Sequence, residues 1–164
     1  MKAKYIAENG ITIALTLIIL YAASILPIST LTILTVSSCL IPISIIRTSI
    51  KNTILVYSGS SILSLFLVPT NIAIYYVSFF GVYGIVKYFS EKIRNIPLEL
   101  FFKLVVFNAL LSVIYFIFTN FLGNLTINYP LYMIWIAGQI VFLIYDYALT
   151  IIISFYLKRI HTNL

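Results

Sequence analysis

The chain has 164 residues and a formal net charge of +6, and hydrophobic residues make up 62% of it whereas charged residues make up only 9%. A soluble domain normally carries about a quarter charged residues, so this composition excludes an ordinary water-exposed globule and makes the lipid bilayer the expected partner. Nucleic acid is excluded as a partner as well, because the basic residues mark the edges of apolar segments and form no single patch.

Six apolar stretches follow one another along the chain, each close to the length of about 20 residues that a membrane-spanning helix needs. The first follows Lys2 and Lys4 and so resembles a signal peptide, but its apolar run exceeds the usual core of ~7–15 residues, and we expect it to be retained. We predict an all-α integral membrane protein, a six-transmembrane-helix bundle that forms a single transmembrane domain over residues 1–164. The helices are expected near 10–26, 29–46, 53–68, 70–86, 100–122 and 131–157.

The basic residues lie at the termini or in and around every second gap between these stretches. The intervening turns, near Pro27, near Pro69 and over 123–130, contain no charged residue. Because cytoplasmic loops carry an excess of Lys and Arg, the pattern predicts cytoplasmic N and C termini and a multi-pass protein of the cell (plasma) membrane. The ten basic residues are Lys2, Lys4, Arg47, Lys51, Lys87, Lys92, Arg94, Lys103, Lys158 and Arg159.

Asp146 lies well inside the sixth apolar stretch. A carboxylate at bilayer depth costs about 2.5–3.5 kcal/mol, so an acid there is expected to be functional or paired. Because successive helical residues turn by about 100°, Asp146 shares one helix face with Tyr132, Trp135 and Gln139. This face combines two amphipathic rings, an amide and an acid, which are side chains that can bind a polar solute.

Two roles for Asp146 follow from this position. It is either a structural acid, paired with Lys103, Arg47 or a tyrosine hydroxyl, or part of one wall of a solute-binding cavity that opens to the outside. Other polar residues could complete such a wall, although each taken singly is an ordinary interhelical hydrogen-bonding residue. These are Asn71, Tyr75 and Ser78 on one face of the fourth helix, and Asn108 and Ser112 on one face of the fifth.

Small residues mark one face of the first helix, where Ala7, Gly10 and Ala14 recur at intervals of about one turn. Small side chains let helix backbones approach closely, so this face either packs within the chain or docks another membrane subunit. Signatures of catalysis and of metal or phosphate binding are missing from the sequence, and its single Cys39 and single His161 form no ligand cluster. We therefore predict no enzyme, no catalytic residue, no metal site and no cofactor.

The length, the six helices and the small-residue face together resemble the S components of energy-coupling factor transporters, which are the substrate-capturing subunits of vitamin uptake systems. Some short runs also resemble those of uncharacterised bacterial membrane proteins of that broader group. These runs are Ile41-Pro42-Ile43 through Arg47, Val68-Pro69 and Phe80-Gly81-Val82-Tyr83-Gly84.

The resemblance implies a function, partners and a docking site. In the family, an Ala-x-x-x-Ala motif on the first helix contacts the membrane coupling subunit, and Gly10 and Ala14 stand at the corresponding positions here. The chain would then bind a vitamin or a similar small molecule from outside, and the coupling subunit and an ATPase pair would drive uptake. The 13 Tyr, 12 Phe and single Trp suit a flat heterocyclic ligand, because aromatic rings bury a large area and stack well.

Two other classes of function are compatible with the same residues. The chain could be a non-transporting interaction or scaffold subunit of envelope assembly, with Asp146 as a structural acid and the small-residue faces as partner sites. It could also be a channel or exporter, in which Asp146 would relay protons or cations.

Overall fold

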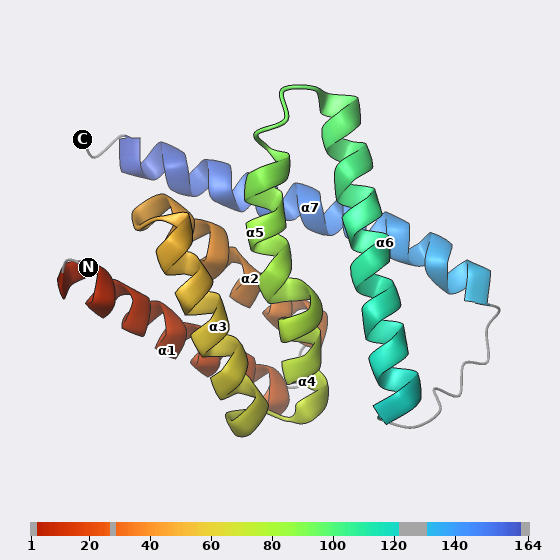
Figure 1. The fold of residues 1–164 in the computed structure, drawn as a ribbon, viewed down its shortest axis with the longest axis horizontal. Coiled ribbons are helices and arrows are strands. Elements are labelled where there is room, and N and C mark those ends of the chain that lie inside the picture. The colour runs from red at the N-terminus through yellow and green to blue at the C-terminus, as the bar shows by residue number, and fades with distance from the viewer. Residues whose placement is uncertain (1–2, 27–28, 122–130, 162–164) are drawn as a thin grey trace. The chain divides into compact units, whose positions relative to one another are not determined.

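The computed structural model describes residues 3–26, 29–121 and 131–161, and within these ranges the chain forms helices and turns but no strand (Figure 1). Its elements are α1 (Ala3–Ile25), α2 (Thr30–Arg47), α3 (Ile50–Leu67), α4 (Thr70–Tyr75), the π-helix η1 (Tyr76–Phe80), α5 (Gly81–Ser90), α6 (Ile96–Phe121) and α7 (Leu131–His161). Since α4, η1 and α5 form one continuous segment, the described residues contain six helices long and apolar enough to cross a membrane. The predicted all-α, six-span membrane fold is confirmed.

Several helices are longer than their apolar stretches predicted. α1 begins at Ala3 rather than near residue 10, and α6 begins at Ile96 rather than near residue 100. The apolar run indicates only the part of a helix that lies in hydrocarbon, whereas backbone hydrogen bonding continues into the polar flanks. At the start of α6, the Glu99 N–H donates to the Asn95 carbonyl at 2.9 Å, and Pro97 fits the first turn because no intrahelical bond to its nitrogen is needed there.

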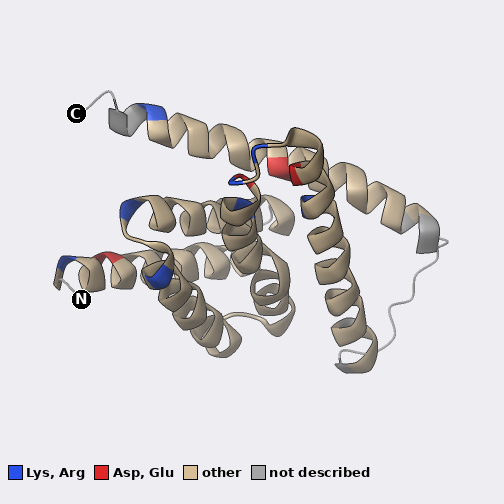
Figure 2. Cartoon of the chain, turned by 45° about the horizontal axis from the view of Figure 1, so that its top comes forward, with Lys and Arg blue, Asp and Glu red and all other residues tan. Residues whose placement is uncertain are grey.

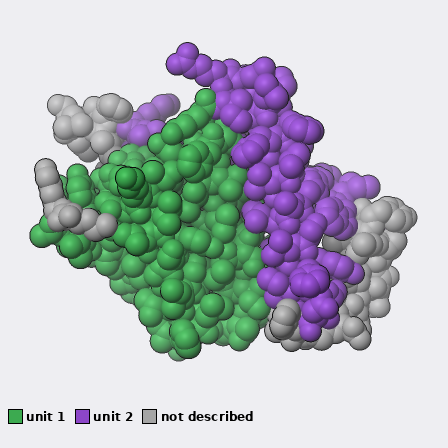
Figure 3. Space-filling view, in the orientation of Figure 1, with its two compact units in different colours: residues 1–92 green, residues 93–164 purple. Residues whose placement is uncertain are grey.

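The helices form two compact units, unit 1 over residues 1–92 and unit 2 over residues 93–164 (Figure 3), and each unit is described by itself. The single domain expected from the sequence stays a prediction. In unit 1, α1 packs against α2 and α3, and α2 packs in addition against η1 and α5. Unit 2 consists of α6 and α7.

A glycine sets the close crossing of α2 and α5. A Cβ atom added at Gly84 would lie 2.8 Å from the Ile41 Cβ and 2.9 Å from the Pro42 Cδ. Only the absence of a side chain allows the two helices to approach this closely, as in other membrane proteins with small residues at helix interfaces.

The π-helix η1 in the fourth span is fixed by two tyrosines. Tyr57 of α3 donates its hydroxyl to the Val77 carbonyl at 2.8 Å, and the buried Tyr76 hydroxyl lies 2.8 Å from the Ser60 Oγ. Gly81 follows directly, where an added Cβ would lie 2.7 Å from the Tyr57 ring. These contacts hold α3 against the widened turn, which is a departure from α-helix that recurs at functional positions in other proteins.

The charged residues of unit 1 gather near the helix ends that lie together at one end of this unit (Figure 2). The start of α1, the end of α2, the start of α3 and the end of α5 lie on the same side of the unit, because neighbouring helices run antiparallel through short turns. The described turn at the opposite end, Val68–Pro69, contains no charge. The residues are Lys4, Glu8, Arg47, Lys51, Lys87, Glu91 and Lys92.

Candidate functional site

The polar residue with the strongest claim to a role, Asp146, forms an ion pair within unit 2. Its Oδ2 accepts a hydrogen bond from the Lys103 Nζ of α6 at 2.9 Å, and Glu99, one turn before Lys103, lies 2.6 Å from the same nitrogen. The Lys103 side chain is 6% exposed and that of Asp146 is 14% exposed. Of the partners that the sequence left open for Asp146, the structure therefore shows Lys103, in contact with two carboxylates.

Two further contacts continue from this ion pair along the same helix pair. The Phe107 and Phe142 rings stack with centroids 4.3 Å apart and planes 16° from parallel. The Gln139 Nε2 then donates to the Asn108 Oδ1 at 2.9 Å, and the Asn108 Nδ2 lies 3.5 Å from the Gln139 Oε1.

We call these three contacts the α6–α7 ladder; its members are Lys103, Phe107 and Asn108 of α6, and Asp146, Phe142 and Gln139 of α7. Residues three or four positions apart lie on the same helix face, so the spacing of the members along both helices lines them up. We call the ladder closed because each of its polar side chains already has a hydrogen-bond or ion-pair partner within it. A ligand that used Asp146 or Gln139 would have to displace Lys103 or Asn108.

The structure thus places three of the predicted wall residues in the ladder: Asn108 and Gln139 are in contact, and Asp146 lies two turns further along α7 in its pair with Lys103. Trp135 lies half-buried one turn before Gln139 on α7. The side chain of Tyr132 lies outside the described residues.

The remaining predicted wall residues belong to unit 1. Asn71 is exposed and Tyr75 is half-buried, both on α4. Ser78 falls within η1. The uniform turn of about 100° per residue that placed Ser78 on a face with Asn71 and Tyr75 therefore does not apply, because a π-helix turns less per residue.

The predicted docking residues Ala7, Gly10 and Ala14 are exposed on α1. A Cβ atom added at Gly10 would meet no atom within 4 Å, and the neighbouring Ile11 is 68% exposed. This face of α1 thus does not pack against the other helices of unit 1, and it presents small residues beside exposed apolar side chains.

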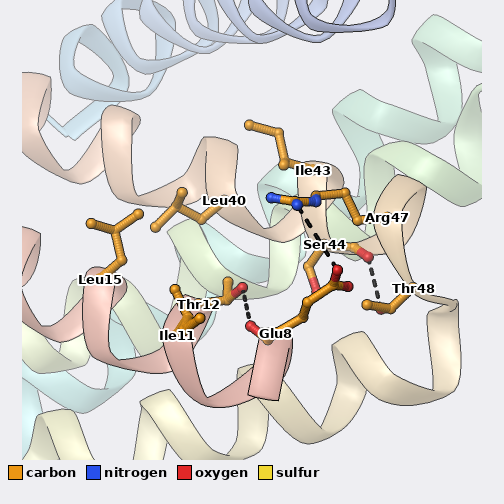
Figure 4. Close-up of a pocket in the computed structure, with 9 residues that line it drawn as sticks. All are labelled: Glu8, Ile11, Thr12, Leu15, Leu40, Ile43, Ser44, Arg47 and Thr48. Carbon is orange, nitrogen blue, oxygen red and sulfur yellow. Dashed lines mark hydrogen bonds and ion pairs between the residues drawn. The ribbon is translucent and has the colours of Figure 1, made fainter. Parts of the chain in front are cut away.

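Sequence reasoning missed a pocket in unit 1 between α1 and α2 (Figure 4), which we call the α1–α2 pocket. It has a volume of about 150 Å³, and Glu8 and Arg47 face each other in it with 3.9 Å between Glu8 Oε1 and Arg47 Nη2. The predicted first helix began at residue 10, so Glu8 was left outside it. Glu8 is one of only four acidic residues in the chain, and this scarcity is a signal that could have drawn attention to it.

Within the described ranges no three His, Cys, Asp or Glu side chains gather in a way that could hold a metal ion. No family model matches the chain, and no curated protein or solved structure matches it either.

Proposed function

We propose that the chain is the substrate-capturing membrane subunit of an uptake transporter of the energy-coupling factor type, which binds a vitamin or a similar small molecule. The observation that carries the proposal is the exposed small-residue face of α1, formed by Ala7, Gly10 and Ala14. Small side chains at these three positions let another helix approach closely, so this face suits a membrane coupling subunit, to which an ATPase pair would bind in turn.

The charge distribution supports an orientation for this subunit. Five basic residues of unit 1 lie at the end where α1 begins and α5 ends, namely Lys4, Arg47, Lys51, Lys87 and Lys92. By the positive-inside rule this end faces the cytoplasm of a plasma-membrane protein, with both chain termini on that side.

In this proposal the ligand site lies along α7 and adjoins the α6–α7 ladder. Trp135 and Tyr132 offer aromatic surface for a flat ring, while Asp146 and Gln139 offer polar groups if ligand groups replace their partners on α6. The role of Asn71 and Tyr75 of α4 as ligand contacts stays a prediction from the sequence.

Gentle affinity purification from native membranes, with mass spectrometry of the retained proteins and metabolites, tests the proposal. We expect a coupling subunit, an ATPase pair and a small metabolite with the unaltered chain. Gly10→Leu and Ala14→Leu should lose the protein partners because they fill the docking face. Ala137→Leu adds the same bulk at an exposed position of α7 and should keep them. Retention of the partners by both α1 variants would contradict the docking role.

A scaffold subunit of envelope assembly is the second candidate function, and the closed α6–α7 ladder favours it. The carboxylate of Asp146 and the amide of Gln139 each have a partner on α6, as expected of residues whose role is to join two helices. Recovery of envelope-assembly proteins without any metabolite in the same purification would support this candidate over the transporter subunit.

A further inference from the structure

The α1–α2 pocket has a charged end and an apolar end, and the spacing of its residues explains why. α1 contributes Glu8, Ile11, Thr12 and Leu15, which are three or four positions apart and so share one helix face. α2 contributes Leu40, Ile43, Ser44 and Arg47 at the same intervals, together with Thr48. Figure 4 shows Glu8 and Arg47 at one end of the pocket, and Leu15 and Leu40 at the other.

The charged end has unused binding capacity. The Glu8 Oε2 is enclosed by protein and has no hydrogen-bond donor, and the 3.9 Å between Glu8 Oε1 and Arg47 Nη2 is too long for a hydrogen bond. Within the described part of the chain Arg47 has no closer partner, although its guanidinium carries five N–H donors. The Glu8 Oε1, which faces Arg47, has no hydrogen bond either, and it is the oxygen that an N–H placed between the two side chains can reach, so this end favours a group that supplies such an N–H.

The threonine hydroxyls in the pocket do not supply that donor, and the third hydroxyl, that of Ser44, accepts a hydrogen bond from the Thr53 Oγ1 at 3.1 Å. Thr12 donates to the Glu8 carbonyl at 2.8 Å, and Thr48 donates to the Ser44 carbonyl at 2.9 Å. Their protons are therefore engaged with the backbone, and only their oxygen lone pairs face the pocket as acceptors.

The apolar end indicates where the rest of a ligand lies. From the charged end, Ile11 and Leu15 run along α1 toward the middle of its span, and Ile43 and Leu40 do the same along α2. Ile11 is 68% exposed and Leu15 is 43% exposed, so this side of the pocket opens onto the surface that a membrane-spanning helix presents to lipid. A ligand can therefore keep an acyl chain in the bilayer while its polar head occupies the pocket.

We propose that the α1–α2 pocket binds the head group of an aminophospholipid, phosphatidylethanolamine. The primary ammonium supplies the N–H that the Glu8 carboxylate lacks, and the phosphate takes the guanidinium donors of Arg47. A linker of two carbons keeps ammonium and phosphate close enough together to face two side chains that are 3.9 Å apart. A cavity of about 150 Å³ is roughly the size that holds a benzene molecule, which is room for a small head group, and the acyl chains follow the apolar residues.

Competing lipids lack one feature each. The choline head group carries three methyl groups on its nitrogen and has no N–H to donate to Glu8. Phosphatidylglycerol has hydroxyl donors but no cation, so it would bring a second negative charge beside the Glu8 carboxylate without an ammonium to balance it. The pocket should therefore prefer phosphatidylethanolamine over both by about tenfold or more, the factor that one charge-assisted hydrogen bond makes.

Titration of the purified full chain with each of the three lipids, followed by native mass spectrometry, measures this preference. Glu8→Gln keeps the shape of the side chain but removes its charge, and should reduce the preference over phosphatidylcholine to about twofold or less. Glu91→Gln removes a comparable carboxylate near the end of α5, one that pairs with Lys87, and should leave the preference unchanged. Arg47→Gln should weaken the binding of all three lipids, because it removes the group that binds the phosphate. The Arg47 side chain is 57% exposed, so this variant provides a second test if Glu8→Gln does not fold.

Equal binding of the three lipids, or a preference that survives Glu8→Gln, would overturn the proposal. Soluble O-phosphoethanolamine tests the source of the head group. If it displaced the lipid completely at comparable concentration, the pocket would be a site for a soluble zwitterion and the lipid proposal would fail. Little displacement is expected, because the free head group makes no contact with the apolar residues of the pocket.

Discussion

Two ion pairs of this protein, one in each unit, use the same kinds of groups and differ in how completely they are satisfied. Lys103 and Asp146 are in hydrogen-bond contact at 2.9 Å, and Glu99 supplies a second carboxylate at 2.6 Å. Glu8 and Arg47 are 3.9 Å apart, and one oxygen of Glu8 has no donor at all. The closed pair joins two helices, whereas the open pair leaves binding capacity for a third group.

The largest expected effect comes from breaking the closed pair on its basic side. Lys103→Met leaves two carboxylates facing each other in apolar surroundings and should lower the free energy of unfolding by about 3–5 kcal/mol. Asp146→Leu should cost less, because Lys103 then keeps Glu99 as its partner. Unfolding titrations of the two single variants and the double variant in detergent measure this. Strictly additive losses would show that the pair is not coupled.

Two glycines show a similar difference between a packed and an exposed site, here without any charge. Gly84→Ala places a methyl group 2.8 Å from Ile41 at the α2–α5 crossing and should destabilise unit 1 by about 1–3 kcal/mol. Gly10→Ala meets no atom within 4 Å, so it should leave stability unchanged or raise it by up to about 1 kcal/mol, because alanine favours a helix more than glycine does. Thermal unfolding of the two purified variants distinguishes them, and equal melting temperatures would argue against a tight crossing at Gly84.

The hydrogen bond between Asn108 and Gln139 in the α6–α7 ladder should contribute less to the free energy of unfolding than the ion pair does. Hydrogen bonds between membrane helices average about 0.6 kcal/mol and reach about 1.7 kcal/mol. A double-mutant cycle with Asn108→Leu and Gln139→Leu should give a coupling energy in this range. A coupling as large as that of Lys103 with Asp146 would mean that the two contacts act as one network.

A small effect on stability is also expected at the open pair. In lipid-free detergent Glu8→Gln should change the free energy of unfolding by no more than about 1 kcal/mol, because the pair is long and Arg47 is largely exposed. The same unfolding titration that is used for Lys103→Met provides the measurement. A loss as large as that of Lys103→Met would place the two pairs in the same class and remove the contrast between them.

The sequence predicts the six spans well, because apolar length is a local property of the chain. The pairing of side chains from different helices is not a local property. Asp146 had three kinds of possible partner, and the choice of Lys103 depends on how α6 and α7 are rotated and shifted against each other. Glu8 was not predicted as a site residue for a related reason. The sequence does not indicate whether a helix begins before its apolar run, among the polar residues that precede it. The α1–α2 pocket depends on that extension, because Glu8 is its acidic residue.

The π-helix in the fourth span has a consequence for the two halves of that span. A single π-turn takes up one residue more than an α-turn, which shifts the angular phase of everything after it by about 100° relative to a continuous α-helix. One helical wheel drawn over residues 70–90 would therefore assign Gly84 to the wrong side, although the structure places it against Ile41 of α2. Deleting one residue between Tyr76 and Phe80 would allow a continuous α-helix in which this glycine still faces α2, whereas converting the π-turn to α-helix without a deletion would rotate it away. The fit of α5 against α2 therefore depends on the number of residues in that turn as much as on their identity.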